Sequence, residues 1–208
     1  LSYGMVELPT GKMKSREGTV VDADDLVEEM ILISKEKTES LGKVSDFTQD
    51  QLDTLYNTIG LGALKFFLLR VDPKKKMIFN PEESIDFHGF TGPFVQYTHA
   101  RIKSILRKTG TTVQLNETAL LPLEKALIKE LSSFPAMVNE AADNLDPSKL
   151  AIYAFNVAKL FNSFYAEHSI NNAESDEKKQ LRIQLGIITA ATLKTAMSAL
   201  GIEVPEQM

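Results

Sequence analysis

Three cations crowd one short stretch near the start of the chain. In TGKMKSREGTVV, which spans residues 10–21, Lys12, Lys14 and Arg16 lie within five consecutive positions. Glycines flank the cations and no apolar periodicity runs through them, which indicates a loop. A glycine-flanked loop with lysines can close over phosphate groups and neutralise the charge on a leaving pyrophosphate. The open alternative is a solvated basic turn whose cations pair with nearby acidic side chains.

This loop does not match the P-loop of nucleotide-binding proteins. That motif requires a glycine, four residues, and then Gly-Lys followed by Ser or Thr. Here six residues separate Gly4 from Gly11, and Lys12 is followed by Met13, so the hydroxyl that would hold magnesium is absent. A phosphate site at this loop would depend on its cations.

A second basic stretch, residues 87–116, contains no Asp or Glu. Its cations are Arg101, Lys103, Arg107 and Lys108. The spacing of His99, Lys103 and Arg107 places them on one face of a helix, with aromatic residues near its start. Such a face suits an RNA backbone and unstacked bases. The equally open alternative is a basic face that pairs with acidic neighbours in the same bundle.

A third candidate is the aromatic-rich segment that follows Pro147. Its aromatic and amide residues are Tyr153, Phe155, Asn156, Phe161, Asn162, Phe164 and Tyr165. We expect most of the aromatic rings to lie in the core. Five aromatic rings on one helix cannot all face the same way, so some are expected at the surface, where they could stack on bases.

The remaining chemistry-bearing residues predict neither a metal site nor a catalytic centre within this chain. The histidines, His88, His99 and His168, have no paired metal-binding spacing and are expected to be structural or solvent-facing, and there is no cysteine. The net charge of −5 means that any nucleic-acid contact must come from a local basic surface. No apolar run is long enough to span a bilayer.

The elements that must position these residues are predicted to be helices. We expect an all-α helix bundle that follows a short extended segment, residues 1–21. Capping signals, such as the Thr48–Gln51 capping box and the Asp146-Pro147 start, mark several helix ends. Helices are expected at residues 24–40, 49–71, 95–108, twice within 120–145 with a break near Pro135, at 148–168 and at 176–200, with a surface turn at 74–84.

Apolar periodicity predicts which sides of the last two helices face the core. The expected core positions are Leu150, Tyr153, Val157, Phe161 and Phe164 in one helix and Leu181, Leu185, Ile188 and Thr192 in the other. Gly60 and Gly62 either weaken the centre of their helix or allow close packing there.

Four segments, taken in order, resemble arginyl-tRNA synthetase. They are LSYGMVELPTGKMKSREGTVVDADDLVEE at residues 1–29, GFTGPFVQYTHARIKSILRK at 89–108, DPSKLAIYAFNVAKLFNSFY at 146–165 and LGIEVPEQM at 200–208. The second is similar to the TGP-x-x-QY-x-HAR pattern of that family and is the most specific of the four. The resemblance covers essentially the whole chain.

The resemblance gives the basic loop a specific role. It implies a class I aminoacyl-tRNA synthetase, which activates arginine with ATP and esterifies the 3′ end of its tRNA. In such enzymes a Lys-Met-Ser-Lys-Ser loop closes on the ATP phosphates. Lys12 and Met13 match its first two letters, whereas Lys14, Ser15 and Arg16 depart from it. We therefore expect residues 12–16 to bind ATP, with Lys12 and Lys14 as the catalytic cations.

The resemblance also implies that the chain is the C-terminal portion of a longer enzyme. The His-x-Gly-His signature of the family does not occur here. We expect residues 1–45 to end the catalytic domain and residues 46–208 to form the helical anticodon-binding domain. Alone, the portion is expected to be inactive, monomeric and cytoplasmic, without membrane contact. ATP with Mg²⁺, and arginine, would bind only together with the missing catalytic domain.

The partner expected of this portion is arginine tRNA. The residues that we expect to contact it are Arg101, Lys103, Arg107, Lys108, Tyr153, Asn156, Asn162, Tyr165 and, by resemblance to the terminal Met of the family, Met208. Two alternatives stay open at this point. One is a helical protein-interaction module without an RNA role, and the other is a self-sufficient nucleotide-binding enzyme.

Overall fold

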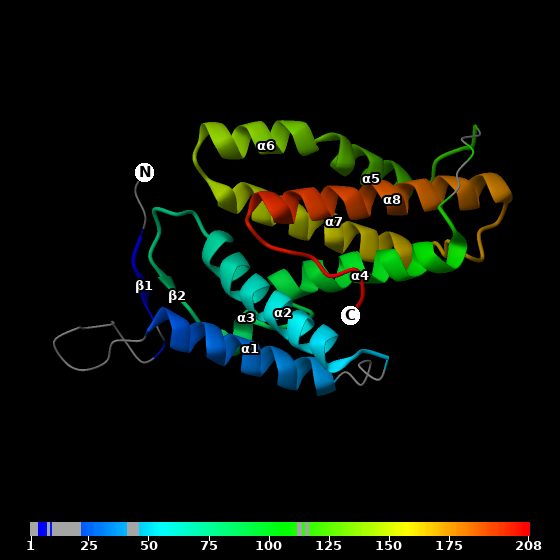
Figure 1. Ribbon diagram of the computed structural model, residues 1–208. Coiled ribbons are helices and arrows are strands. Elements are labelled where there is room, and N and C mark those ends of the chain that lie inside the picture. Colours follow the sequence, from blue (N-terminus) through cyan, green and yellow to red (C-terminus); the bar gives the residue numbers. More distant parts are fainter. Residues whose placement is uncertain (1–3, 8, 10–21, 41–45, 112–113, 115–116) are drawn as a thin grey trace.

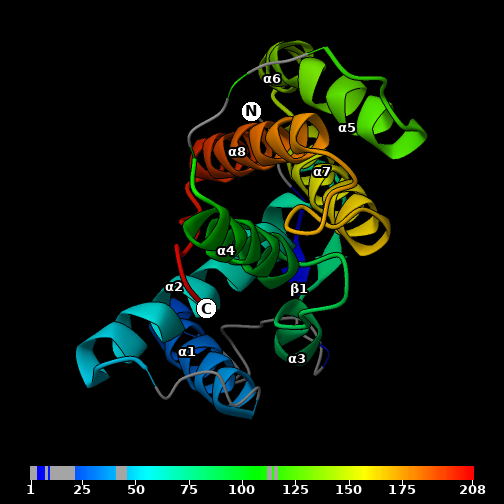
Figure 2. The ribbon, with the colours of Figure 1, turned by 90° about the vertical axis from the view of Figure 1, so that its right-hand side faces the viewer.

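The computed structural model describes residues 4–7, 9, 22–40, 46–111, 114 and 117–208. These residues are mostly helical, which confirms the predicted fold class (Figure 1). The helices are α1 (Ala23–Ser40), α2 (Gln49–Leu69), α3 (Pro81–Ser84), α4 (Gly92–Thr109), α5 (Pro122–Ser132), α6 (Phe134–Asp143), α7 (Pro147–Glu167) and α8 (Asp176–Ala199). Helices α4, α7 and α8 pack on one another, α5 and α6 lie against α7, and α2 joins α1 to α4 (Figures 1 and 2).

Local capping chemistry sets the helix boundaries, as predicted. The side chain of Thr48 accepts a hydrogen bond from the backbone N–H of Gln51, whose own side chain accepts one from the backbone N–H of Thr48. Asn80 caps α3 and Asp146 caps α7, each followed by a proline in the first turn. Gly110 ends α4 with φ at 80°, a backbone angle that glycine adopts at little cost.

The main core lies between α4, α5, α7 and α8, and it confirms the predicted face of α7. All five expected positions on that helix, from Leu150 to Phe164, are buried. The predicted face of α8 is only partly right, because Ile188 is 39% exposed. Since α8 packs against α4, α5 and α7, its buried arc is wide and centres near Thr189 and Leu193. Ile188 falls just outside that arc.

A second, smaller core joins α1 to α2. Its buried residues are Met30, Ala63, Phe67, Phe79 and Ile85. Helix α2 also contributes Phe66 to the main core, so it forms part of both cores. The expected division of the chain between residues 45 and 46 stays a prediction, and the shared core shows that α1 and α2 are packed as one unit.

Glycines allow α2 to approach its neighbours at the level of the backbone. A β carbon on Gly60 would lie 2.9 Å from the carbonyl oxygen of Met30 in α1. A β carbon on Gly62 would lie 2.3 Å from Nε2 of Gln96 in α4. These glycines therefore serve close packing, which was one of the two roles that the sequence left open.

The predicted surface turn at residues 74–84 contains a short strand instead. Met77–Ile78 forms β2, which pairs in parallel with β1 (Val6–Glu7). Phe79 is fully buried in the second core and donates its backbone N–H to the carbonyl of Glu7. The stretch is extended because the side chain of Phe79 turns into this core while β1 supplies hydrogen-bond partners.

A buried ionic network ties α5 to α8. The carboxylate of Glu124, which is fully buried, accepts hydrogen bonds from Lys178 Nζ and from Arg182 Nε at 3.1 Å. Arg182 also reaches Glu174 at 2.6 Å. Burial opposes ionisation of Glu124, but the N–H of Leu121 and the two cations outweigh that effect and hold its pKa below the ordinary 4.5.

Replacing Glu124 with glutamine should strongly destabilise the fold. Glu124→Gln leaves Lys178 and Arg182 as buried cations without their shared counter-ion, which we expect to lower the free energy of unfolding by about 3–5 kcal/mol. Urea unfolding at pH 7 measures the loss. The same change at exposed Glu117 serves as the control and should shift the free energy by less than ~0.5 kcal/mol. Equal effects of the two substitutions would contradict a stabilising network.

Candidate nucleic-acid interface

Helix α4 carries two polar stripes that face different neighbours. Thr91 caps the helix, and Pro93 lies in its first turn. From there Gln96, His99, Lys103 and Arg107 recur three or four positions apart and form one stripe. The second stripe, about a third of a turn away, consists of Tyr97, Arg101, Ser104 and Lys108.

The first stripe contacts the C-terminal segment, which we define as residues 201–208. This segment leaves α8 and runs across α4 to the chain end (Figure 1). Gln96 Nε2 donates to the carbonyl of Glu203 at 2.8 Å, and His99 Nδ1 lies 2.9 Å from the carbonyl oxygen of Pro205. Arg107 donates to the carbonyl of Glu206 at 3.0 Å. The stripe therefore binds the backbone of its own chain.

Glu206 neutralises part of the predicted RNA-binding surface. Its carboxylate lies 3.0 Å from Nζ of Lys103 and 3.6 Å from Nζ of Lys194. Burial raises the pKa of Glu206, but the hydrogen bond and charge of Lys103 more than compensate and leave it lowered. Lys103 thus has an acidic neighbour within the bundle, as in the alternative interpretation, whereas Arg107 contacts the backbone carbonyl of Glu206.

The second stripe borders a recess of about 460 Å³ that we call the α4 recess. Its lining residues are Asp46, Phe47, Tyr97, Ala100, Arg101, Ser104, Arg107, Gln207 and Met208. Three of the predicted RNA-binding residues, Arg101, Arg107 and Met208, line it, although Met208 is far from the other two in the sequence. The recess combines two cations with two aromatic rings and a thioether, which are groups that bind phosphates and base faces, and with one carboxylate, that of Asp46.

Helix α7 holds the guanidinium of Arg101 in place. Arg101 lies over the ring of Tyr165, 5.1 Å from its centroid, and its Nη1 is 3.5 Å from Oδ1 of Asn162. Asn162 in turn donates to Thr98 Oγ1 at 2.9 Å. The structure therefore brings Arg101, Asn162, Tyr165 and Met208 together around one site. The contact with a ring and an amide limits the orientations open to a side chain that is otherwise exposed.

Two other predicted residues lie elsewhere. Tyr153 is buried in the main core, where its hydroxyl donates to the carbonyl of Glu130 at 2.9 Å. Burial and the charge of Glu130 raise the pKa of Tyr153 to about 12. Asn156 is exposed, but nine positions from Tyr165 it points to the opposite side of α7. Lys108 is exposed at the end of the second stripe.

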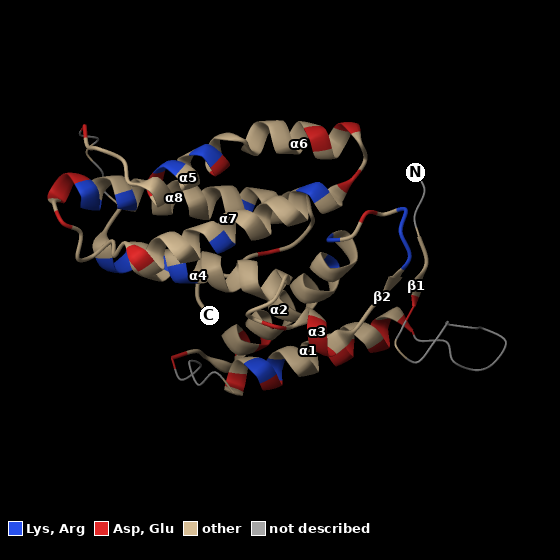
Figure 3. Cartoon of the chain, turned by 180° about the vertical axis from the view of Figure 1, so that it is seen from behind, with Lys and Arg blue, Asp and Glu red and all other residues tan. Residues whose placement is uncertain are grey.

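The acidic side chains of α1 do not line this site, although Asp46 does. Helix α1 carries six acidic side chains against two lysines, and red ribbon follows both α1 and α3 in Figure 3. Helix α4 carries no acidic residue. A polyanion that approaches the chain therefore meets a less repulsive surface at α4 than at α1.

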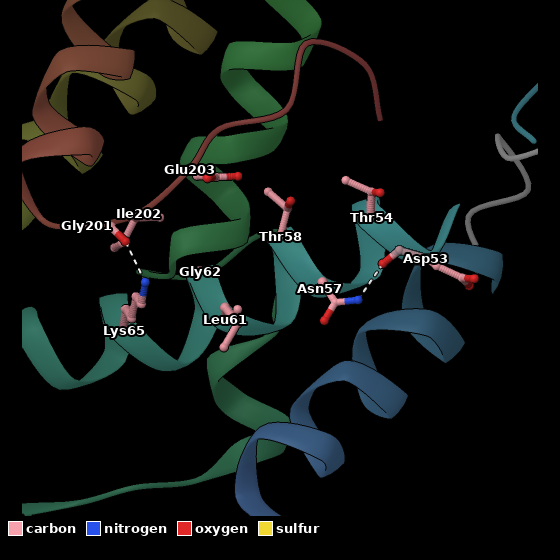
Figure 4. Close-up of a pocket in the computed structure, with 10 residues that line it drawn as sticks. All are labelled: Asp53, Thr54, Asn57, Thr58, Leu61, Gly62, Lys65, Gly201, Ile202 and Glu203. Carbon is pink, nitrogen blue, oxygen red and sulfur yellow. Dashed lines mark hydrogen bonds between the residues drawn. The ribbon is translucent and has the colours of Figure 1, made fainter. Parts of the chain in front are cut away.

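A second recess, between α2 and the C-terminal segment, has a different character (Figure 4). Lys65 spans one end of it and donates to the carbonyl of Gly201 at 2.7 Å. The carboxylates of Asp53 and Glu203 line the same recess. Two carboxylates face one lysine in this recess, whereas Arg101 and Arg107 outnumber Asp46 in the α4 recess, which is therefore the better candidate for a nucleic acid.

The proposed ATP-binding residues, Lys12, Met13, Lys14, Ser15 and Arg16, lie outside the described residues. In the described part of the chain no group of three or more His, Asp or Glu side chains is placed to hold a metal ion. No described helix is long and apolar enough to cross a membrane.

Six residues that line the α4 recess were not among the predicted site residues: Asp46, Phe47, Ala100, Gln207 and two polar residues of α4, Tyr97 and Ser104. The last two follow from the helical spacing around Arg101, since they lie four positions before and three positions after it. No comparable pattern in the sequence indicated that the C-terminal segment docks on α4, because, apart from the Lys103–Glu206 ion pair, the hydrogen bonds join side chains of α4 to backbone carbonyls.

Comparisons with known proteins agree on one family. A family model described as the DALR anticodon binding domain matches residues 95–208. The chain is 54% identical to the arginine–tRNA ligase of Flavobacterium psychrophilum and 51% identical to that of Amoebophilus asiaticus. Both alignments cover 100% of this chain, but only 35% and 36% of those relatives. The chain thus spans about a third of their length.

A solved structure gives the same picture in three dimensions. The arginyl-tRNA synthetase of Thermus thermophilus superposes with a TM-score of 0.91 at 32% identity, over 100% of this chain and 35% of that one. The arginyl-tRNA synthetase of Plasmodium falciparum, at 22% identity and a TM-score of 0.77, shares the fold.

The stability of the chain should fall in mild acid because of His99. Burial lowers the pKa of this imidazole below 6.5, an effect that Lys103 and Lys194 reinforce and that Pro205 and Glu206 oppose. The unfolded state then binds more protons than the folded state as the pH falls below about 6.5, so the stabilisation present above that pH is lost. Between pH 7.5 and 5, urea unfolding should show a smaller loss of unfolding free energy for His99→Asn than for the unaltered chain. Identical pH dependence of the two chains would contradict a neutral, buried imidazole.

Proposed function

Because the chain belongs to the DALR anticodon binding domain family, we propose that it is the tRNA-binding, C-terminal portion of an arginine–tRNA ligase. The longer protein would join arginine to its tRNA with ATP and Mg²⁺ in the cytoplasm. The support is the similarity, over the whole of this chain, to about a third of the length of curated arginine–tRNA ligases, and the match to a solved arginyl-tRNA synthetase. In this proposal the chain contributes recognition of the anticodon side of the tRNA.

The observation that carries the proposal is the placement of Arg101 between Tyr165 and the α4 recess. A guanidinium has five N–H donors, and the contact with Asn162 uses one nitrogen, which leaves donors for the acceptors of a base or a phosphate. The cation–π contact with Tyr165 limits the orientations open to the group. A planar donor held in this way can pair with two acceptors on one base edge.

The other residues of the recess have complementary roles in this proposal. The ring of Tyr97 and the thioether of Met208 offer apolar surfaces to a base that has left its stack. Lys108, exposed two helical turns beyond Arg101 on the second stripe, would contact the backbone phosphates. Lys103 and Arg107 would add positive charge nearby, although Glu206 offsets part of it.

The basic loop is assigned by resemblance alone. We propose that Lys12 and Lys14 bind the phosphates of ATP in the longer ligase, with Met13, Ser15 and Arg16 completing the loop. The support is the Lys-Met start that the loop shares with the synthetase signature.

Substitution of Lys14 tests the role of the loop in the longer ligase. Lys14→Ala should reduce ATP–pyrophosphate exchange by about 100-fold or more, because a charge that stabilises the transition state is removed. A parallel change at exposed Lys35 should leave the exchange rate within about twofold. Exchange that survives Lys14→Ala unchanged would exclude Lys14 from this role.

Substitution of Arg101 tests the RNA interface directly. Arg101→Ala should weaken binding of an arginine tRNA transcript by about 10- to 100-fold, because a well-placed donor pair contributes about 1–3 kcal/mol. Arg101→Lys keeps the charge without the planar fork and should lose most of the discrimination against anticodon-substituted transcripts. Fluorescence anisotropy at physiological salt measures both effects.

The control for this experiment is Lys35→Gln, which removes one exposed cation from acidic α1 and should change affinity less than about twofold. Equal, weak binding of every transcript that vanishes as salt rises towards physiological levels would overturn anticodon recognition. No binding of any RNA would favour a protein-interaction module.

A further inference from the structure

We propose that His99 is a positioning residue, which holds the C-terminal segment so that Met208 forms one wall of the α4 recess. The inference rests on the proposed function and extends it to a residue that does not line the recess. The C-terminal segment runs from α8 across α4 (Figure 1), and its last residue, Met208, lines the α4 recess together with Arg101.

The segment has two parts that are held in different ways. Ile202 is 2% exposed and belongs to the main core, and Val204 packs against that core. Beyond Val204 no side chain belongs to the main core. Beyond that point, the contacts that join Pro205 and Glu206 to α4 are polar.

Among those contacts, the one made by His99 is the most rigid. The carbonyl of Pro205 can only accept, so Nδ1 of His99 must carry the proton and donate it over 2.9 Å. His99 is 1% exposed, on a helix that is packed on several sides. By contrast, Arg107 and the carboxylate of Glu206 are exposed and lose rotamer freedom in their contacts.

Gln96 provides a second fixed point one turn earlier. This residue is fully buried, and its Nε2 donates both to the carbonyl of Glu203 and to that of Thr58 at 2.9 Å. A single amide therefore joins α2, α4 and the segment. From Pro205 only three residues lead to Met208, a reach of at most about 10 Å. Fixing the Pro205 carbonyl therefore confines Met208 to the neighbourhood of the recess.

The alternative is that His99 only fills space in the core. The two roles can be separated by a matched pair of substitutions. An asparagine amide nitrogen lies as many bonds from Cβ as Nδ1 does, whereas a glutamine amide nitrogen corresponds to Nε2. Both substitutions remove the ring, but only His99→Asn retains a donor where Pro205 needs one.

The first arm of the experiment measures RNA binding by the 208-residue chain. With an arginine-tRNA anticodon stem-loop as probe, His99→Gln should weaken binding by about fivefold, which corresponds to one buried hydrogen bond. His99→Asn should stay within about twofold of the unaltered chain. Equal losses in the two variants would contradict the positioning role.

The second arm repeats the measurement in a chain that lacks residues 205–208 but keeps buried Ile202 and Val204. If His99 acts through the segment, neither His99→Gln nor His99→Asn should change the affinity of this shortened chain for RNA. A loss of affinity that persists there would show that His99 affects RNA by another route and would overturn the proposal.

The third arm needs no RNA. Carboxypeptidase should release the terminal residues several-fold faster from His99→Gln than from His99→Asn or the unaltered chain, because the segment opens more often. Equal release rates would contradict the proposed hold on the segment. If the release rates differ as expected but the unaltered chain binds no RNA, the proposed function fails while the hold of His99 on the segment stands.

Discussion

The docking of the C-terminal segment on α4 is the interaction on which the candidate site depends. Two buried side chains, Gln96 and His99, donate to carbonyls of the segment, and Ile202 anchors its start in the main core. Without this docking the α4 recess would lose the wall that Gln207 and Met208 provide. The helix bundle thus serves as a rigid platform, and the segment completes the site on it.

The same docking divides the cations of α4 between two tasks. Lys103 and Arg107 contact Glu206 of the chain itself, whereas Arg101 is turned towards α7 by Tyr165 and Asn162. An acidic chain can in this way keep a local cationic site, because the acidic side chains of α1 lie elsewhere on the surface. Arg101 therefore carries more of the proposed recognition than a count of basic residues would suggest.

The sequence predicted the fold more completely than it predicted the candidate site. Capping residues such as Thr48 and Asp146, and the apolar period of α7, act locally, and they placed the helices correctly. The sequence did not reveal β2, the buried Glu124 network or the docked segment, since each joins residues that are distant along the chain. Tyr153 illustrates the limit: its type suits base stacking, but only packing decides that it lies in the core.

The most direct test of this account follows the methyl group of Met208 while RNA is added. The chain contains seven methionines, and the signal of Met208 in a ¹³C-methyl NMR spectrum is identified by its loss from a chain that lacks this residue. An arginine-tRNA anticodon stem-loop should shift the Met208 signal saturably and leave that of Met30, buried in the second core, unchanged. RNA that binds the chain while the Met208 signal stays in place would contradict the central claim that the docked segment completes the binding site.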